Sequence, residues 1–327
     1  MELANVKSMT SKSNNQGRGY EFACINTLAQ EIAKSRPVTV VRNSSYEAAE
    51  NAWQTLTPQT QDIYLTSGKA AAEVIFKLEP RILEDGDDTL ELLLQKDKKG
   101  KEGDVRDVLI IRRNISWEIG LSLKHNHFAV KHSRLSRDID FGNVWYGIPC
   151  SQSYWDSVLP VFDYLEKCKS NDLSFNDLTN KEDDIYVPVL KAFLRELNMQ
   201  ALAHREIPAK LVEYLLGKYD FYKVISVDNE ALTLIQTYNL HGSLNREGVS
   251  DGKKPSILVP KVDLPSRLVS LQFKPGSKNT LELYMDAGWQ FSFRIHSAAT
   301  RCEPSLKFDI QLVGKPAQII EITKLWR

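Results

Sequence analysis

This chain of 327 residues lacks any run of about 18 apolar residues, the length that a membrane-spanning helix needs. Its first residues also lack the apolar core of a secretory signal peptide. We therefore expect no contact with a membrane and a location in the cytoplasm.

Cysteine is scarce, and the four cysteines are spread over the chain without a CxxC pair. This pattern excludes a zinc ribbon and a disulfide framework, so reduced thiols are expected. Internal repeats, a glycine-rich phosphate loop, the HExxH pattern and the GxSxG turn are absent as well. The formal net charge of zero counts against a protein that coats nucleic acid without sequence preference, although basic groups can still gather in one cleft.

The residues that are present suit a folded chain, with 42% hydrophobic and 26% charged residues. Apolar side chains three and four residues apart predict helices at 19–33, 44–56, 59–78, 154–167, 187–197 and 209–219. Short β-branched and aromatic runs predict strands at 90–95, 107–112 and 117–124, and a series of further strands from residue 221 onward. We therefore predict an α/β (α+β) fold, in which a mixed sheet is flanked by helices and a β-rich C-terminal region is added.

The strands at 107–112 and 117–124 are close enough in sequence to form a hairpin. A hairpin pairs the start of its first strand with the end of its second, so Asp107 and Lys124 are expected side by side at its open end. A carboxylate can hold Mg²⁺, and a lysine beside it can orient the attacking water and balance the charge of a phosphate. The pair therefore indicates metal-dependent cleavage of a phosphodiester, while a solvated surface ion pair is the simpler interpretation of the same residues.

The segment that follows Lys124 is rich in hydrogen-bond donors. Between residues 96 and 137 there are eleven Lys and Arg against five Asp and Glu, a balance that suits a phosphate backbone. We predict that DNA is contacted by His125, Asn126, His127, Lys131, His132 and Arg134. Arg294 and His296 are further candidates, since arginine can pair with two acceptors of a guanine. A solvated loop and ordinary surface cations are the alternatives.

The hairpin resembles the PD-(D/E)xK nuclease superfamily. The blocks GDVRDVLIIRR, IGLSLKHNHFAVKHSRLS, FGNVWYGIPCSQSYW and GWQFSFRIHSAATRCEPSLKFDIQLVG resemble the HaeIII-type restriction endonucleases. This resemblance extends over nearly the whole chain. It implies a restriction-endonuclease-like core and a type II restriction endonuclease that makes Mg²⁺-dependent double-strand cuts in DNA at GGCC. It also implies a cognate DNA methyltransferase in the same system.

The chain departs from the superfamily pattern at Ser122, where a second acid normally stands two residues before the lysine. The first helix of the superfamily often supplies an acid, and Glu21 lies on the apolar stripe of the first predicted helix. Glu21 is therefore our candidate for the second ligand of Mg²⁺, although it could also be the exposed end of that stripe. Asp104 and Glu118 are alternative acids. Glu118 lies six residues before Lys124, which is roughly 20 Å along a strand at ~3.3 Å per residue. This distance is too long for one metal site unless the strand bulges.

The composition divides the chain into four parts. We expect a mobile tail at 1–18, a nuclease core at 19–167, a linker with helices at 168–220 and a β-rich DNA-gripping region at 221–327. A palindromic target favours a homodimer, because two identical subunits match its two-fold symmetry. A monomer that nicks each strand in turn is the alternative.

Two alternatives stay open at this point. The chain could be a non-catalytic DNA- or RNA-binding protein whose acid and lysine form only a structural pair. A cluster of His125, His127 and His132 is also similar to the ββα-metal nucleases, in which a histidine is the general base.

Overall fold

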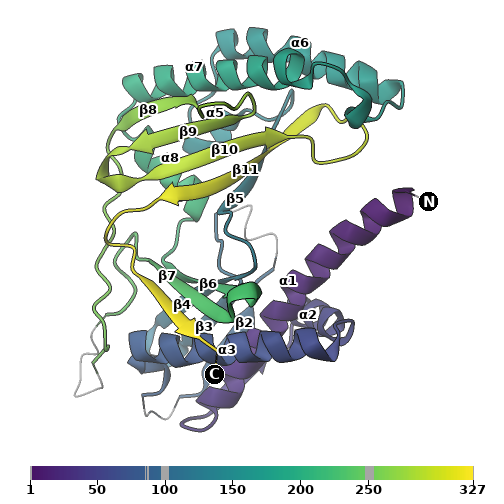
Figure 1. The fold of residues 1–327 in the computed structure, drawn as a ribbon. Helices are drawn as coiled ribbons and strands as arrows, with labels where there is room; N and C mark the ends of the chain where they lie inside the picture. Colours follow the sequence, from purple (N-terminus) through teal and green to yellow (C-terminus); the bar gives the residue numbers. More distant parts are fainter. Residues whose placement is uncertain (1, 85, 87, 97–102, 247–253, 327) are drawn as a thin grey trace. The chain divides into compact units, whose positions relative to one another are not determined.

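The structure is a computed structural model that describes residues 2–84, 86, 88–96, 103–246 and 254–326. The chain forms two compact units (Figure 1). Unit 1 contains Met1–His127, Gly217–Val262 and Gln318–Arg327, and unit 2 contains Phe128–Leu216 and Asp263–Ala317. No helix among the described residues is long and apolar enough to cross a membrane.

Unit 1 is built on a seven-stranded sheet with the order β1-β2-β3-β4-β6-β7-β12. Its strands are β1 (Val38–Val41), β2 (Leu90–Leu94), β3 (Val108–Arg112), β4 (Trp117–His125), β6 (Phe221–Val227), β7 (Leu232–Tyr238) and β12 (Glu321–Leu325). The pairs β1–β2 and β4–β6 are parallel, and the other neighbours are antiparallel. The predicted mixed sheet is therefore confirmed.

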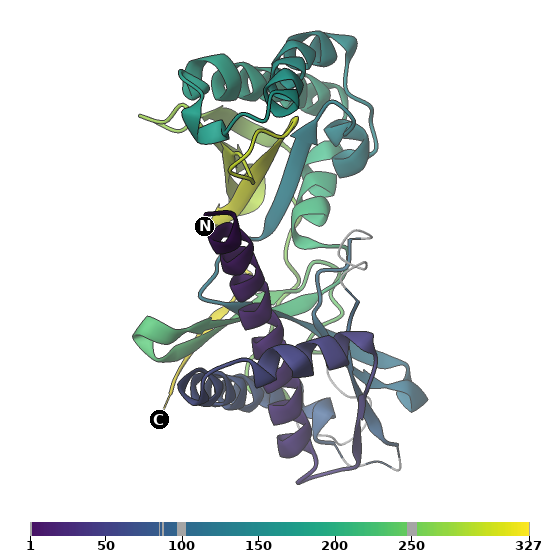
Figure 2. The same cartoon turned by 90° about the vertical axis from the view of Figure 1, so that its right-hand side faces the viewer.

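Three helices pack against one face of this sheet: α1 (Glu2–Ile32), α2 (Ser44–Gln54) and α3 (Pro58–Leu78) (Figures 1 and 2). Alternate residues of β4, among them Leu121 and Leu123, point into the apolar core that these helices complete. Side-chain caps explain where two of the helices begin, since Asn43 accepts backbone hydrogen bonds at the start of α2 and Thr57 does so for α3.

The helix α1 is longer than predicted. It begins at Glu2 rather than at residue 19, so it includes most of the segment 1–18 that the sequence predicts as a tail. The stretch 2–16 contains neither proline nor glycine, so no residue in it breaks a helix. Gly19 itself lies against the segment that follows α2, where a Cβ atom would come within 2.6 Å of Leu56 Cδ1.

The two units differ from the predicted ranges 19–167, 168–220 and 221–327. The parallel pairing of β4 with β6 brings residues after 217 into the sheet of the hairpin, and β12 joins the same sheet at its edge. A parallel pair needs a long crossover connection, and here that connection contains the four helices of unit 2. This long-range pairing leaves no local trace in the sequence.

Unit 2 has a five-stranded antiparallel sheet with the order β5-β11-β10-β9-β8. Its strands are β5 (Lys131–Ser136), β8 (Leu268–Phe273), β9 (Thr280–Met285), β10 (Gln290–His296) and β11 (Ser305–Gly314). Its helices are α5 (Phe141–Tyr146), α6 (Gln152–Ser170), α7 (Val187–Ala203) and α8 (Ile207–Leu216). The predicted β-rich C-terminal region is thus present. The strand β5 joins it from the segment after Lys124, for which no strand is predicted.

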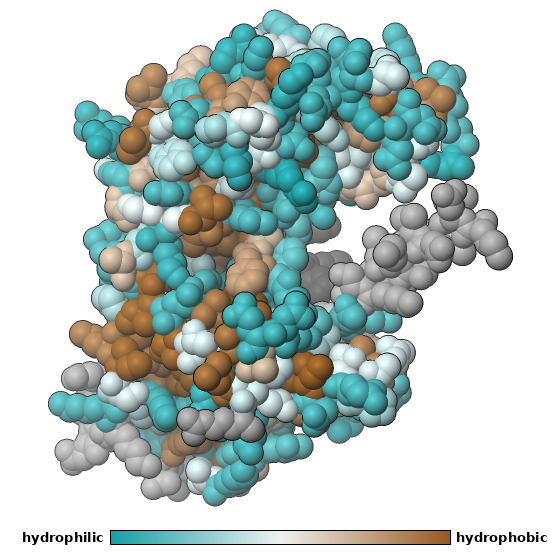
Figure 3. Space-filling model, in the orientation of Figure 1, coloured by the Kyte–Doolittle hydropathy of each residue, from teal (hydrophilic) through white to brown (hydrophobic). Residues whose placement is uncertain are grey.

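The helices of unit 2 lie on one face of this sheet (Figures 1 and 2). Aromatic side chains fill the space between the two layers, with Phe293 and Phe308 of the sheet near Trp145 and Phe193 of the helices. The outer surface of the helical layer is mostly hydrophilic (Figure 3). The face of the sheet that carries Phe293 and Phe308 is therefore its core face.

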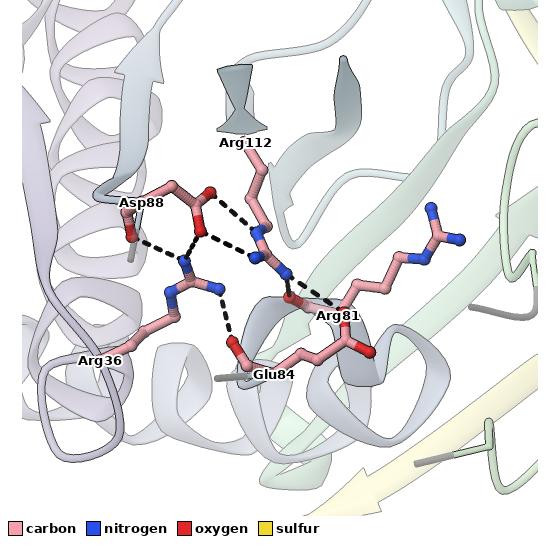
Figure 4. Close-up of polar contacts among 5 residues, drawn as sticks. All are labelled: Arg36, Arg81, Glu84, Asp88 and Arg112. Carbon is pink, nitrogen blue, oxygen red and sulfur yellow. Dashed lines mark hydrogen bonds and ion pairs between the residues drawn. The ribbon is translucent and has the colours of Figure 1, made fainter. Parts of the chain in front are cut away.

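A buried ion-pair network lies in unit 1 beside β2 and β3 (Figure 4). Asp88 accepts hydrogen bonds from Arg36 Nη2 at 2.5 Å and from Arg112 Nη2 and Nε at 2.8 and 3.0 Å. Arg36 also donates to the backbone oxygen of Glu84. Arg112 reaches the Glu84 carboxylate and the backbone oxygen of Arg81 as well. The network ties the chain after α1 to the end of β3.

Candidate active site

The hairpin of β3 and β4 brings Asp107 and Lys124 together as predicted. Asp107 directly precedes β3, and Val108 pairs with Leu121 in the antiparallel register. Lys124 Nζ lies 3.1 Å from Asp107 Oδ2, and the two side chains are 31% and 24% exposed. The pair is therefore partly withdrawn from water, unlike a fully solvated surface ion pair.

The carboxylate of Asp107 is held from one side only. Its Oδ2 accepts hydrogen bonds from the backbone N–H of Leu123 at 2.6 Å, from Lys124 Nζ at 3.1 Å and from Ser122 Oγ at 3.4 Å. Its Oδ1 accepts none from the residues that the structure describes. One carboxylate oxygen is thus left to bind a cation, which is the donor type that Mg²⁺ prefers.

A second lysine lies beside Ser122. In the parallel register of β4 and β6, Ser122 is opposite Lys223, so both side chains belong to the same face of the sheet as Lys124. Burial lowers the pKa of Lys223 to about 7, and the charge of Lys124 adds to this effect. The place where the superfamily has an acid therefore holds a hydroxyl group with a buried amine next to it.

Glu21 is on α1, in the same unit as Asp107. The helix contacts β4, and Glu21 is half-buried one turn before Cys24. Burial raises the pKa of the Cys24 thiol to about 12, and the charges of Glu21 and Asp107 both raise it further. Both carboxylates are therefore within electrostatic range of one buried thiol. The role of Glu21 as the second metal ligand remains a prediction.

The alternative acids Asp104 and Glu118 are both bound to Arg106. Asp104 accepts from Arg106 Nε and Nη2 at 2.8 Å, and Glu118 lies 2.9 Å from Arg106 Nη1. Burial opposes the ionisation of Asp104, but Arg106 outweighs it and lowers the pKa of that carboxyl. The Arg106 side chain covers Gly120, where a Cβ atom would lie only 2.0 Å from Arg106 Cδ. These two acids are thus engaged in an ion-pair cluster rather than at Lys124.

His125 points away from the face that carries Lys124, because neighbouring residues of a strand alternate. Its Nε2 lies 2.6 Å from Asp228 Oδ2, and its Nδ1 lies 3.1 Å from the Tyr64 hydroxyl of α3. Asn126 accepts a hydrogen bond from the backbone N–H of Asp228. The expected DNA contact of His125 does not agree with this position, while Asn126 and His127 are exposed.

Lys131 also differs from the expectation of a DNA contact. It lies on the helix side of β5, where its Nζ donates to the backbone oxygen of Tyr214 at 2.6 Å and stands 3.8 Å from that ring. His132 and Arg134 are exposed on β5, and Arg294 on β10 is exposed as well. The strand β5 follows the hairpin, so the helix that a ββα-metal nuclease requires at this point is not formed.

Comparison with known proteins gives a consistent picture. Residues 17–316 match the family described as HaeIII restriction endonuclease. The chain is 51% identical over 319 residues to the type II restriction enzyme HaeIII of Haemophilus aegyptius, which covers 97% of this chain and 99% of that enzyme. No solved structure matches the chain. The enzyme is thereby favoured over the non-catalytic binding protein, and the chain belongs to the HaeIII restriction endonuclease family, whose activity is the site-specific cleavage of DNA.

Proposed function

We propose that Asp107 and Glu21 hold Mg²⁺ in this restriction enzyme and that Lys124 assists the water that attacks the phosphodiester. The observation that carries this proposal is the half-buried Asp107–Lys124 pair, in which Asp107 Oδ2 is fixed and Oδ1 accepts no hydrogen bond from the described residues. The pair lies within the part of the chain that matches the family.

Restriction endonucleases generally use a divalent metal ion. Two carboxylates, one from α1 and one from the start of β3, provide the hard oxygen donors that suit Mg²⁺. When bound, the ion stabilises the negative charge that develops on the phosphate.

The residues of the chain itself supply orientation and charge. The backbone N–H of Leu123 and the Ser122 hydroxyl fix the Asp107 carboxylate before substrate arrives. Asp107 in turn holds the Lys124 ammonium at the site, where it can donate to the attacking water or to a phosphate oxygen. Groups that are positioned in advance need no reorganisation during the reaction, which is why such arrangements accelerate it.

The family likeness also supports a target and partners. We propose GGCC as the sequence that is cut, a homodimer as the form that matches the two-fold symmetry of this site, and a cognate DNA methyltransferase that protects it. The substrate further favours the cytoplasm as the place of action.

A plasmid digestion tests this function. Discrete fragments with ends inside GGCC should appear with Mg²⁺ and be absent when the metal is chelated. A shift of the plasmid in a gel without cutting would support the non-catalytic binding protein instead. Sedimentation of the enzyme with a duplex that contains one site tests the homodimer, since two chains per duplex are expected.

A further inference from the structure

The sheet of unit 2 has an outer face that is turned away from α5, α6, α7 and α8. On β11 the buried residues Leu306 and Phe308 belong to the core face, so Lys307 between them belongs to the outer face. The same alternation puts Arg134 of β5 and His296 of β10 on the outer face. These three residues come from distant parts of the sequence and from three neighbouring strands.

The register aligns these residues into one row. Lys307 is directly opposite Arg134 on one side and directly opposite His296 on the other. The row contains no acid. In the next row Asp309 lies between His132 and Arg294, at 3.7 Å and 3.2 Å from their nitrogen atoms.

The charge of the basic row is only partly balanced. Arg134 donates to Glu303 at 3.1 Å and to Ser305 at 2.9 Å. For Lys307 no ion pair is formed with any residue that the structure describes. Partial burial lowers the pKa of Lys307, and the nearby charge of Arg134 lowers it further, while Asp309 acts against both. Like charges directly opposite each other destabilise a sheet, so an external anion would stabilise this row.

We propose that the row Arg134–Lys307–His296 binds the phosphate backbone of the DNA substrate, with Lys307 at its centre. This inference rests on the proposed function for its ligand, which is duplex DNA. Neighbouring strands are ~4.8 Å apart, so the row extends over about 10 Å of the sheet. Each strand of a duplex carries one phosphate per ~3.4 Å of helix axis, and the row can therefore meet more than one phosphate.

The salt dependence of DNA binding tests this proposal, measured on the full chain with target duplex and without divalent metal. Loss of one phosphate contact should make the slope of log affinity against log salt shallower by about 0.9. Between 50 and 200 mM salt, the affinity of Lys307→Gln should therefore fall about 3.5-fold less than that of the unchanged enzyme. Lys307→Arg keeps the charge and should keep the original slope.

Lys278→Gln is the matched control. Lys278 stands in the turn between β8 and β9 and pairs with Asp183 at 2.8 Å, outside the basic row. Its loss removes the same charge from unit 2 and should leave the slope unchanged. A wild-type slope for Lys307→Gln overturns the proposal, and so does an equal change in Lys278→Gln.

Two further measurements keep the outcomes separate. If Lys307→Gln lowers the melting temperature, Arg134→Gln decides, because it removes a charge from the same row and should again flatten the slope. Cleavage by saturating Lys307→Gln with Mg²⁺ should persist, since Asp107 and Lys124 are unchanged. Failure of the unchanged enzyme to cut would count against the proposed function, while the slopes would still decide whether the row binds DNA.

Discussion

Replacement of Asp88 by Asn should strongly destabilise the protein. The carboxylate lies between Arg36 and Arg112, and all three side chains are buried, with exposed fractions of 7%, 1% and 5%. Removal of one partner from a buried ion pair typically costs about 3–5 kcal/mol, because the remaining charge stays buried without compensation. Both arginines keep hydrogen bonds to backbone oxygens, and Arg112 keeps Glu84. We therefore expect the lower end of this range, about 3 kcal/mol.

Urea denaturation followed by circular dichroism measures this loss. Glu91→Gln is the control, since it breaks an ion pair of similar geometry, at 2.6 and 2.7 Å, with the exposed Arg113. Exposed pairs contribute little because water screens them, so this variant should unfold near the wild-type urea concentration. A loss in Asp88→Asn no larger than that in Glu91→Gln would refute the proposed stabilising role of the network.

The stability difference between wild type and Asp88→Asn should depend on pH. Hydrogen bonds from Arg112, and then from Arg36, hold the pKa of Asp88 well below its ordinary value. A carboxyl whose pKa is lowered by folding stabilises the protein above its unfolded pKa of ~3.9, and this stabilisation is lost as the pH falls below that value. The difference between wild type and Asp88→Asn should therefore be full at neutral pH and shrink below about pH 4. A difference that stays constant down to pH 3 would contradict the assignment.

Three further variants test side-chain roles. Glu21→Gln should reduce cleavage by about 10²-fold or more and raise the Mg²⁺ concentration that cleavage requires. Glu118→Gln should change cleavage little. If a cleavage time course shows that Glu118→Gln is the inactive variant and Glu21→Gln is active, the second metal ligand is wrongly assigned. Lys131→Gln should leave the salt dependence of DNA binding unchanged. It should lower the free energy of unfolding by about 1.5–3 kcal/mol, because the hydrogen bond to the Tyr214 carbonyl is lost. A shallower salt slope in this variant would contradict the position of Lys131 on the helix side of β5.

Local pattern was sufficient to predict the hairpin and its ion pair. The two strands are regular apolar runs, separated by only a short turn, so their pairing follows from the chain itself. The ends of the strands then bring Asp107 and Lys124 to one place, at 3.1 Å. Most helices and the later strands were predicted for the same reason, because each has its own apolar period.

Pairings between distant segments could not be predicted in this way. The neighbour of Ser122 is Lys223, and a whole crossover connection separates them. The neighbour of Arg134 is Lys307, in a strand near the end of the chain. The segment 131–136, KHSRLS, has no regular apolar alternation, so its sequence predicts no strand, and the inward orientation of Lys131 on β5 does not follow from it.

We propose that Asp107 and Lys124 carry out the chemistry and do not read the DNA sequence. A gel shift on target DNA beside a cleavage time course, for Asp107→Ala and Lys124→Ala, tests it most directly. Specific binding should survive in both variants, while cleavage by Lys124→Ala should fall at least about 10²–10³-fold, the effect of one group that stabilises a transition state. Near-normal cutting by Lys124→Ala would contradict this proposal. Loss of both binding and cutting, together with a lowered melting temperature, would also contradict it, because that is the result expected of a purely structural ion pair.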